Sequence, residues 1–73
     1  MLFVEIRVEG HLDEQWSEWL EGLTIVYGEG SVAILTGLLA DQAALYGVIS
    51  KLRDLGIRLL SVESQASAPD GGA

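Results

Sequence analysis

The sequence contains no cysteine, and this absence excludes disulfide bonds and thiolate metal sites. Lysine and arginine number only four against 11 acidic residues, which gives a net charge of −7. Because phosphate backbones and anionic lipid surfaces are bound through cations, we expect neither nucleic acid nor a membrane as a partner. No apolar run approaches the ~20 residues of a membrane-spanning helix. A basic leader is lacking as well, so we expect a cytoplasmic protein.

Apolar side chains, in contrast, are plentiful for so short a chain. Of 73 residues, 49% are hydrophobic, and the mean hydropathy is +0.35. A domain of this size buries only about 60% of the surface of its unfolded chain. Small domains often need an additional source of stability, and with disulfides excluded the remaining one is association. The composition therefore favours a homo-oligomer, either a dimer or a larger assembly.

Two periodicities predict the order of the elements. Residues 2–9 alternate between apolar and other side chains, which indicates a half-buried strand. Trp16, Trp19 and Leu20 recur at helical spacing behind a possible N-cap, Asp13, and a second and longer helical pattern follows Asp41. The expected elements are strands at 2–9, 23–27, 31–36 and 57–63, with helices that end at Gly22 and Gly56.

This order predicts an α+β, ferredoxin-like β-α-β-β-α-β sandwich, in which two helices cover one face of an antiparallel-type sheet. We expect the first and third strands to be central and parallel to each other, with the second and fourth at the edges. Residues 1–63 would form this single domain. Residues 64–73 are rich in Ser, Ala, Asp and Gly, and we expect them to form a flexible C-terminal tail.

The hairpin around the Gly28-Glu29-Gly30 turn is apolar on both faces of its strands. The open face of the third strand would carry either Val32, Ile34 and Thr36 or the alternate set, and both sets contain apolar residues. Two open faces could stack about 10 Å apart, and pairing through an edge strand is the competing geometry. The interface residues we expect are Phe3, Val26, Tyr27, Ala33, Leu35 and Leu60.

The loop after the first strand is the weaker candidate site. His11 is the only histidine, and with Asp13 and Glu14 nearby it could serve as a general base or as one metal ligand. Further metal ligands are not found at a recognisable spacing, and Asp13 also fits the role of a helix cap. We assign no catalytic residue, metal or cofactor, and we keep Gly10, His11, Leu12 and Asp13 as candidate ligand-binding residues.

Several strings resemble a widespread group of small bacterial and archaeal proteins of unassigned function. They are Gly10-His11-Leu12-Asp13 with the paired tryptophans, Leu35-Thr36-Gly37, Asp41-Gln42-Ala43-Ala44-Leu45 and Lys51-Leu52-Arg53-Asp54-Leu55-Gly56. The resemblance covers roughly residues 3–63 and implies no activity, cofactor or site residue.

Three functions follow as hypotheses. The first is a non-catalytic, self-associating interaction or regulatory module that oligomerises through apolar sheet surface. The second is a sensor of small, amino-acid-like molecules, with its site at the first strand–helix loop or between subunits; this hypothesis depends on analogy of fold. The third is a small dimeric enzyme that uses His11.

Overall fold

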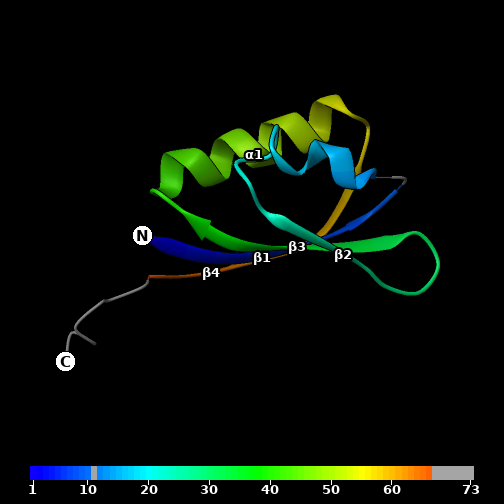
Figure 1. Ribbon diagram of the computed structural model, residues 1–73, viewed down its shortest axis with the longest axis horizontal. Coiled ribbons are helices and arrows are strands. Elements are labelled where there is room, and N and C mark those ends of the chain that lie inside the picture. Colours follow the sequence, from blue (N-terminus) through cyan, green and yellow to red (C-terminus); the bar gives the residue numbers. More distant parts are fainter. Residues whose placement is uncertain (11, 67–73) are drawn as a thin grey trace.

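The computed structural model describes residues 1–10 and 12–66, and within them four strands form one sheet. The strands are β1 (Leu2–Glu9), β2 (Thr24–Tyr27), β3 (Val32–Leu39) and β4 (Arg58–Ala66). A single 3-10 turn, η1 (Glu14–Ser17), lies between β1 and β2, and the helix α1 (Gln42–Asp54) connects β3 to β4. Both α1 and η1 lie on the same side of the sheet (Figure 1).

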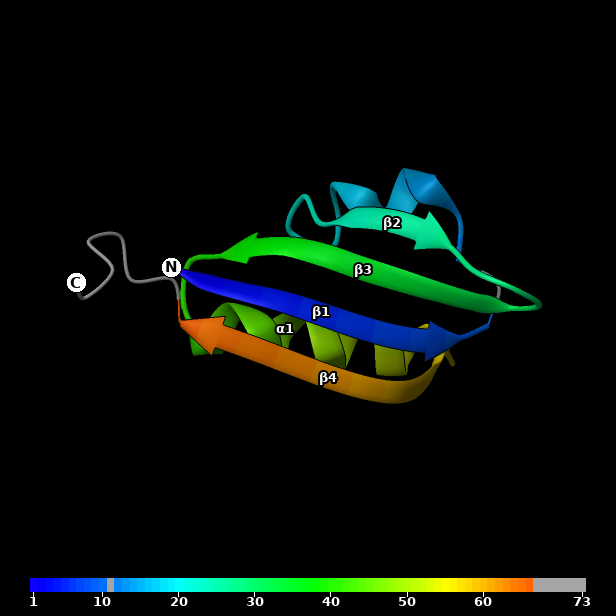
Figure 2. The same ribbon diagram turned by 90° about the horizontal axis from the view of Figure 1, so that it is seen from below.

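The strands are arranged in the order β2-β3-β1-β4, and every neighbouring pair is antiparallel (Figure 2). The expected central position of the first and third strands is confirmed, but their expected parallel pairing is wrong. Leu2 lies opposite Leu39, and Glu9 lies opposite Val32. The reason is that β2 runs in the same direction as β1, and the following hairpin then reverses the chain.

The two-helix, ferredoxin-like sandwich is also wrong, because the described residues contain one α-helix rather than two. In place of the first helix the chain makes only the short turn η1. Leu20 N–H donates both to Trp16 O at 2.9 Å and to Ser17 O at 3.1 Å, and the chain then turns away. Glu21 has a φ of 63° and Gly22 a φ of 76°, so the left-handed backbone ends the turn before a helix can grow.

The helix α1 forms where the second helical pattern predicts it. Asp41 Oδ1 accepts a hydrogen bond from Ala44 N–H at 2.9 Å, which caps the first turn. Leu45, Val48 and Leu52 are buried against the sheet. Lys51 and Arg53 lie in the last turn, where their positive charge suits the helix dipole.

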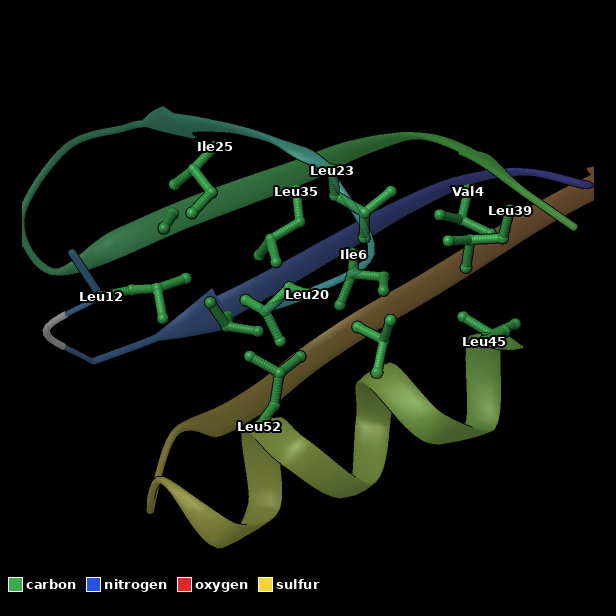
Figure 3. Packing of buried hydrophobic residues seen from close by; sticks show 13 residues of the cluster. Val4, Ile6, Leu12, Leu20, Leu23, Ile25, Leu35, Leu39, Leu45 and Leu52 are labelled. Carbon is green, nitrogen blue, oxygen red and sulfur yellow. The ribbon is translucent and has the colours of Figure 1, made fainter. Parts of the chain in front are cut away.

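The core lies between the sheet and these covering segments (Figure 3). Val4, Ile6 and Val8 of β1 are fully buried at its centre. Gly37, opposite Val4, leaves room for the first crossover to approach, because a Cβ at this position would lie 2.9 Å from Leu23 Cδ2. The other buried residues are Leu12, Leu20, Leu23, Ile25, Ala33, Leu35, Leu39, Leu45, Val48 and Leu52.

The last strand is longer than the sequence indicates. Gln65 lies opposite Phe3 and Ser64 opposite Val4, so these residues belong to β4 and not to a tail. The expected tail therefore begins too early at residue 64, and its remainder, residues 67–73, lies outside the described residues. Within residues 1–10 and 12–66, no helix is long and apolar enough to cross a membrane.

Candidate functional site

The face of the sheet opposite α1 is uncovered within the described residues (Figure 2). Figure 2 views this open face, and no described helix or loop lies across it. Facing residues of antiparallel strands point to the same side. Since Val4, Ile6 and Val8 point into the core, the other residues of β1 point to the open face. They are Phe3, Glu5, Arg7 and Glu9, as the alternation in the sequence predicts.

One half of the open face is apolar, and we call it the apolar patch. Phe3 of β1 lies opposite Leu38 of β3, and Ile34 of β3 lies opposite Val26 of β2. Phe3, Val26 and Leu38 are 44%, 50% and 52% exposed, which is high for such large apolar side chains. Ile34 is partly buried among these neighbours. The patch consists of Phe3, Val26, Val32, Ile34 and Leu38.

Apart from Phe3, the rest of the open face, over β1 and β4, is polar. Arg7 Nη2 lies 3.2 Å from Glu5 Oε2, and Arg58 Nη1 lies 3.8 Å from Glu9 Oε1. Glu63 of β4 stands opposite Glu5, so two carboxylates face each other across the pair of strands. The open face is therefore divided along its width, with apolar side chains toward β2 and β3 and charges toward β4.

The expected interface residues are divided between the surface and the core. Phe3 and Val26 belong to the apolar patch, and Leu60 is 46% exposed where a bulge interrupts the pairing of β4 with β1. Ala33 and Leu35, in contrast, are 1% and 0% exposed, because they lie opposite Val8 and Ile6 in the core. Their expected place at an interface is therefore corrected, and the open face carries Val32, Ile34 and Thr36 instead.

Tyr27 is 51% exposed, but it lies opposite Ala33 on the α1 side of the sheet. Its hydroxyl donates a hydrogen bond to Leu12 O at 2.7 Å and so ties β2 to the first crossover. Desolvation by the surrounding atoms, with the carboxylates of Glu14 and Asp13, raises the pKa of Tyr27.

The loop after β1 uses its polar groups within the protein. Gly10 N–H donates to Ser31 O at 2.9 Å, and Leu12 is 2% exposed with its carbonyl bound to Tyr27. Asp13 Oδ1 accepts from Gln15 N–H at 3.1 Å as the cap of η1. His11 lies outside the described residues. The comparison with two-helix sensor domains loses its basis once the first helix is absent, and residues 1–10 and 12–66 contain no cluster of three potential metal ligands.

The two tryptophans link the first crossover to α1. The rings of Trp16 and Trp19 have centroids 5.1 Å apart and are tilted by 54°. Lys51 Nζ lies 5.4 Å from the centre of the Trp19 ring and donates to Trp19 O at 2.8 Å. It also lies 3.4 Å from Glu21 Oε2. This set of contacts holds the crossover against the helix.

Sequence reasoning missed a second apolar surface, along β4. Leu59 and Val62 lie opposite Val8 and Ile6, so they point to the α1 side, yet they are 42% and 36% exposed. Ile49, Arg53, Ile57 and Leu59 line a shallow groove between α1 and the start of this strand. The sequence did contain a signal for this surface, because both alternating sets of residues along β4 include apolar side chains.

Comparison with known protein families gives one match. Residues 3–63 match the family model described as Domain of unknown function (DUF8691), so the chain belongs to this family. This agrees with the resemblance to proteins of unassigned function. No curated protein matches the chain.

Proposed function

We propose that this member of the DUF8691 family is a non-catalytic interaction or regulatory module that associates with its own copies through the open face of its sheet. The apolar patch is the observation that supports this function. Its members form two groups, Phe3 with Leu38 and Val26 with Ile34 and Val32, and Thr36 of β3 lies between the groups. Exposed apolar surface rimmed by polar residues marks interaction sites. Removing apolar surface from water is worth roughly 25 cal/mol per Å².

A two-fold axis is the simplest way to cover the patch. Two-fold interfaces bring the same surface of both copies together, so the patch meets its own copy. Facing sheets pack about 10 Å apart, which lets the side chains of the two patches interdigitate. Arg7 of β1 lies opposite Ile34, so its ion pair with Glu5 lies directly beside the patch, and the stacking leaves this pair at the rim of the interface.

Electrostatics opposes the association at long range and predicts its dependence on salt. Each copy carries a net charge of −7, and Glu5 and Glu63 border the patch. Added salt screens repulsion between like charges over roughly 10 Å at 0.1 M. We therefore expect the association to strengthen between low and moderate ionic strength, because salt weakens the repulsion between the two copies and leaves their apolar contacts intact.

Sedimentation velocity of an Ile34→Glu variant tests this function. A carboxylate at residue 34 would lie opposite Arg7, which supports the folded monomer, but it would place a charge at the centre of the patch. We expect the sedimenting mass to fall to half that of the unchanged chain at about 50 μM, where a Kd in the micromolar range gives mainly associated protein.

Ser50→Glu is the matched control, because it adds the same charge on an exposed position of α1 away from the patch. It should leave the mass unchanged, and circular dichroism should show the same fold in all three proteins. An unchanged chain and an Ile34→Glu variant of equal mass would refute this function.

A further inference from the structure

The outer edge of β4 is the longer of the two sheet edges and carries the second apolar surface. β4 has nine residues, whereas β2 at the opposite edge has only four. Between Leu59 and Val62, β4 has one bulge as its only edge protection, because it contains no proline and its charged residues, Arg58 and Glu63, flank this stretch. No strand within residues 1–10 and 12–66 pairs with this outer edge.

We infer that β4 pairs antiparallel with β4 of a second copy, about a two-fold axis that passes between Leu60 and Ser61. This interface extends the proposed self-association to a second surface and does not depend on the open face. It would join two sheets edge to edge into one continuous sheet, with both copies of α1 on the same side.

Charge complementarity selects this register. With the axis between Leu60 and Ser61, Arg58 of each copy faces Glu63 of the other. Both residues point to the open face, since their neighbours on β1 are Glu9 and Glu5. Directly opposed unlike charges stabilise a pair of strands, and they occur twice by symmetry. A register centred on Glu63 also matches the faces of the strands, but it sets two carboxylates against each other.

Apolar complementarity supports the same register on the other side of the sheet. Leu59 of each copy faces Val62 of the other, and these are the two side chains of β4 that α1 leaves 42% and 36% exposed. Leu60, 46% exposed, lies next to the axis. The pairing would thus cover the apolar surface that the helix of one copy does not reach.

The bulge in β4 is compatible with this pairing. Leu60 is the extra residue, because Arg7 lies opposite Ser61 and Val8 opposite Leu59. The two-fold axis places the bulges of both strands side by side. On each strand Leu60 and Ser61 separate Leu59 from Val62, so the spacing of the facing positions is the same on both strands. Neither strand is displaced against the other.

The chain has no cysteine, so disulfide cross-linking between introduced cysteines reports the register directly. Leu59→Cys and Val62→Cys chains are prepared separately, mixed, and oxidised by air at about 50 μM. Facing residues fall within the Cα separation that a disulfide needs, and we expect cross-linked dimer in the mixture. Either variant alone should give little, because the same residue on the partner strand lies three positions, about 10 Å, further along.

A mixture of Leu59→Cys with Ser64→Cys chains is the matched control, since residue 64 is exposed on the same face of β4 but outside the register. Cross-linking at equal rates in all samples, or in none, would overturn the inference. An extended segment of another protein paired with β4 would leave the purified chains without cross-links and would overturn it too.

Charge exchange provides a second and independent measurement. Arg58→Glu should weaken the association of this edge roughly tenfold, since both symmetric pairs become like-charged. The Arg58→Glu/Glu63→Arg double variant should recover it. Failure of the double variant to recover would count against the register.

The sedimenting masses of the unchanged chain and of the two charge variants distinguish the open-face interface from the β4 edge interface. If both operate and their two-fold axes meet at right angles, the unchanged chain sediments as a tetramer. Ile34→Glu then reduces it to a dimer, and Arg58→Glu moves the transition from tetramer to dimer to a roughly tenfold higher protein concentration. A dimer sensitive only to Arg58→Glu supports the edge and refutes the open-face function. A dimer sensitive only to Ile34→Glu supports the open-face function and refutes the pairing of the β4 edges.

Discussion

The two segments that cross over the α1 side of the sheet bury similar side chains with very different backbones. The second crossover uses α1, 13 residues long, and buries Leu45, Val48 and Leu52. The first uses only the four-residue η1, which itself contains no buried residue. It nevertheless buries Leu12, Leu20 and Leu23, which lie outside that turn.

The difference teaches that burial, rather than helix length, determines what a crossover contributes to a small core. In the first crossover the side chain of Ser17 replaces part of a helical hydrogen-bond pattern, since its hydroxyl donates to Leu23 O at 2.6 Å. Tyr27 and Lys51 bind further carbonyls of the same segment. These contacts satisfy backbone groups that an α-helix would otherwise satisfy internally.

The largest expected effect tests this equivalence with one leucine from each crossover. Leu20→Ala and Leu52→Ala each remove a side chain that is at most 2% exposed. We expect each to lower the free energy of unfolding by about 2–5 kcal/mol, as the loss of buried leucine leaves a cavity. Urea unfolding at one fixed protein concentration measures both, and Tyr46→Ala is the control, because it truncates a large exposed side chain of α1 that lies in neither proposed interface.

A Leu20→Ala loss no greater than that of Tyr46→Ala, whose side chain is 59% exposed, would mean that the first crossover is only loosely attached. In that case the equivalence of the two crossovers would be wrong.

Sequence patterns predicted the second crossover better than the first for a physical reason. Caps specify where a helix begins, and both Asp13 and Asp41 cap as expected. Length depends on whether further turns bury apolar side chains, and of the expected stripe only Leu20 is fully buried, whereas Trp16 is partly buried against the core and Trp19 is 42% exposed. Spacing alone does not distinguish these outcomes.

The same limit applies to the candidate surfaces. Because β3 is apolar on both faces, the sequence could not decide whether Ile34 or Leu35 lies inward, and the register with β1 decides it. Strand β4 extends to Ala66 through polar residues, since pairing with β1 rather than burial holds them. The positions of the central and edge strands, in contrast, followed from element order.

A smaller effect separates the two caps. Asp41→Ala should lower the free energy of unfolding by about 1 kcal/mol, the usual cost of a lost N-cap. Asp13→Ala should cost less, because η1 has only four residues and none of them is buried. Urea unfolding ranks the two variants, with Asp41→Asn, which preserves a capping oxygen, as the control. The opposite ranking would show that η1, despite its length, organises the first crossover.

The smallest effect concerns the hydrogen bond that ties β2 to the first crossover. Tyr27→Phe removes the donor to Leu12 O, and we expect a lower urea midpoint at neutral pH. The folded-state pKa of Tyr27 is raised above its ordinary value, so the folded chain holds this proton more tightly than the unfolded chain. The stability that it contributes is therefore present below about pH 10 and is lost as the pH rises through the raised pKa.

The difference in urea midpoint between the unchanged chain and Tyr27→Phe should accordingly shrink above about pH 10. Tyr46→Phe is the control, because Tyr46 is 59% exposed and its hydroxyl has no hydrogen-bond partner within the part of the chain that the structure describes. A difference that stays constant through this range would mean that the hydroxyl contributes packing alone. The first crossover would then be held by Leu12, Leu20 and Leu23 without help from the phenol, as α1 is held by its own three buried side chains.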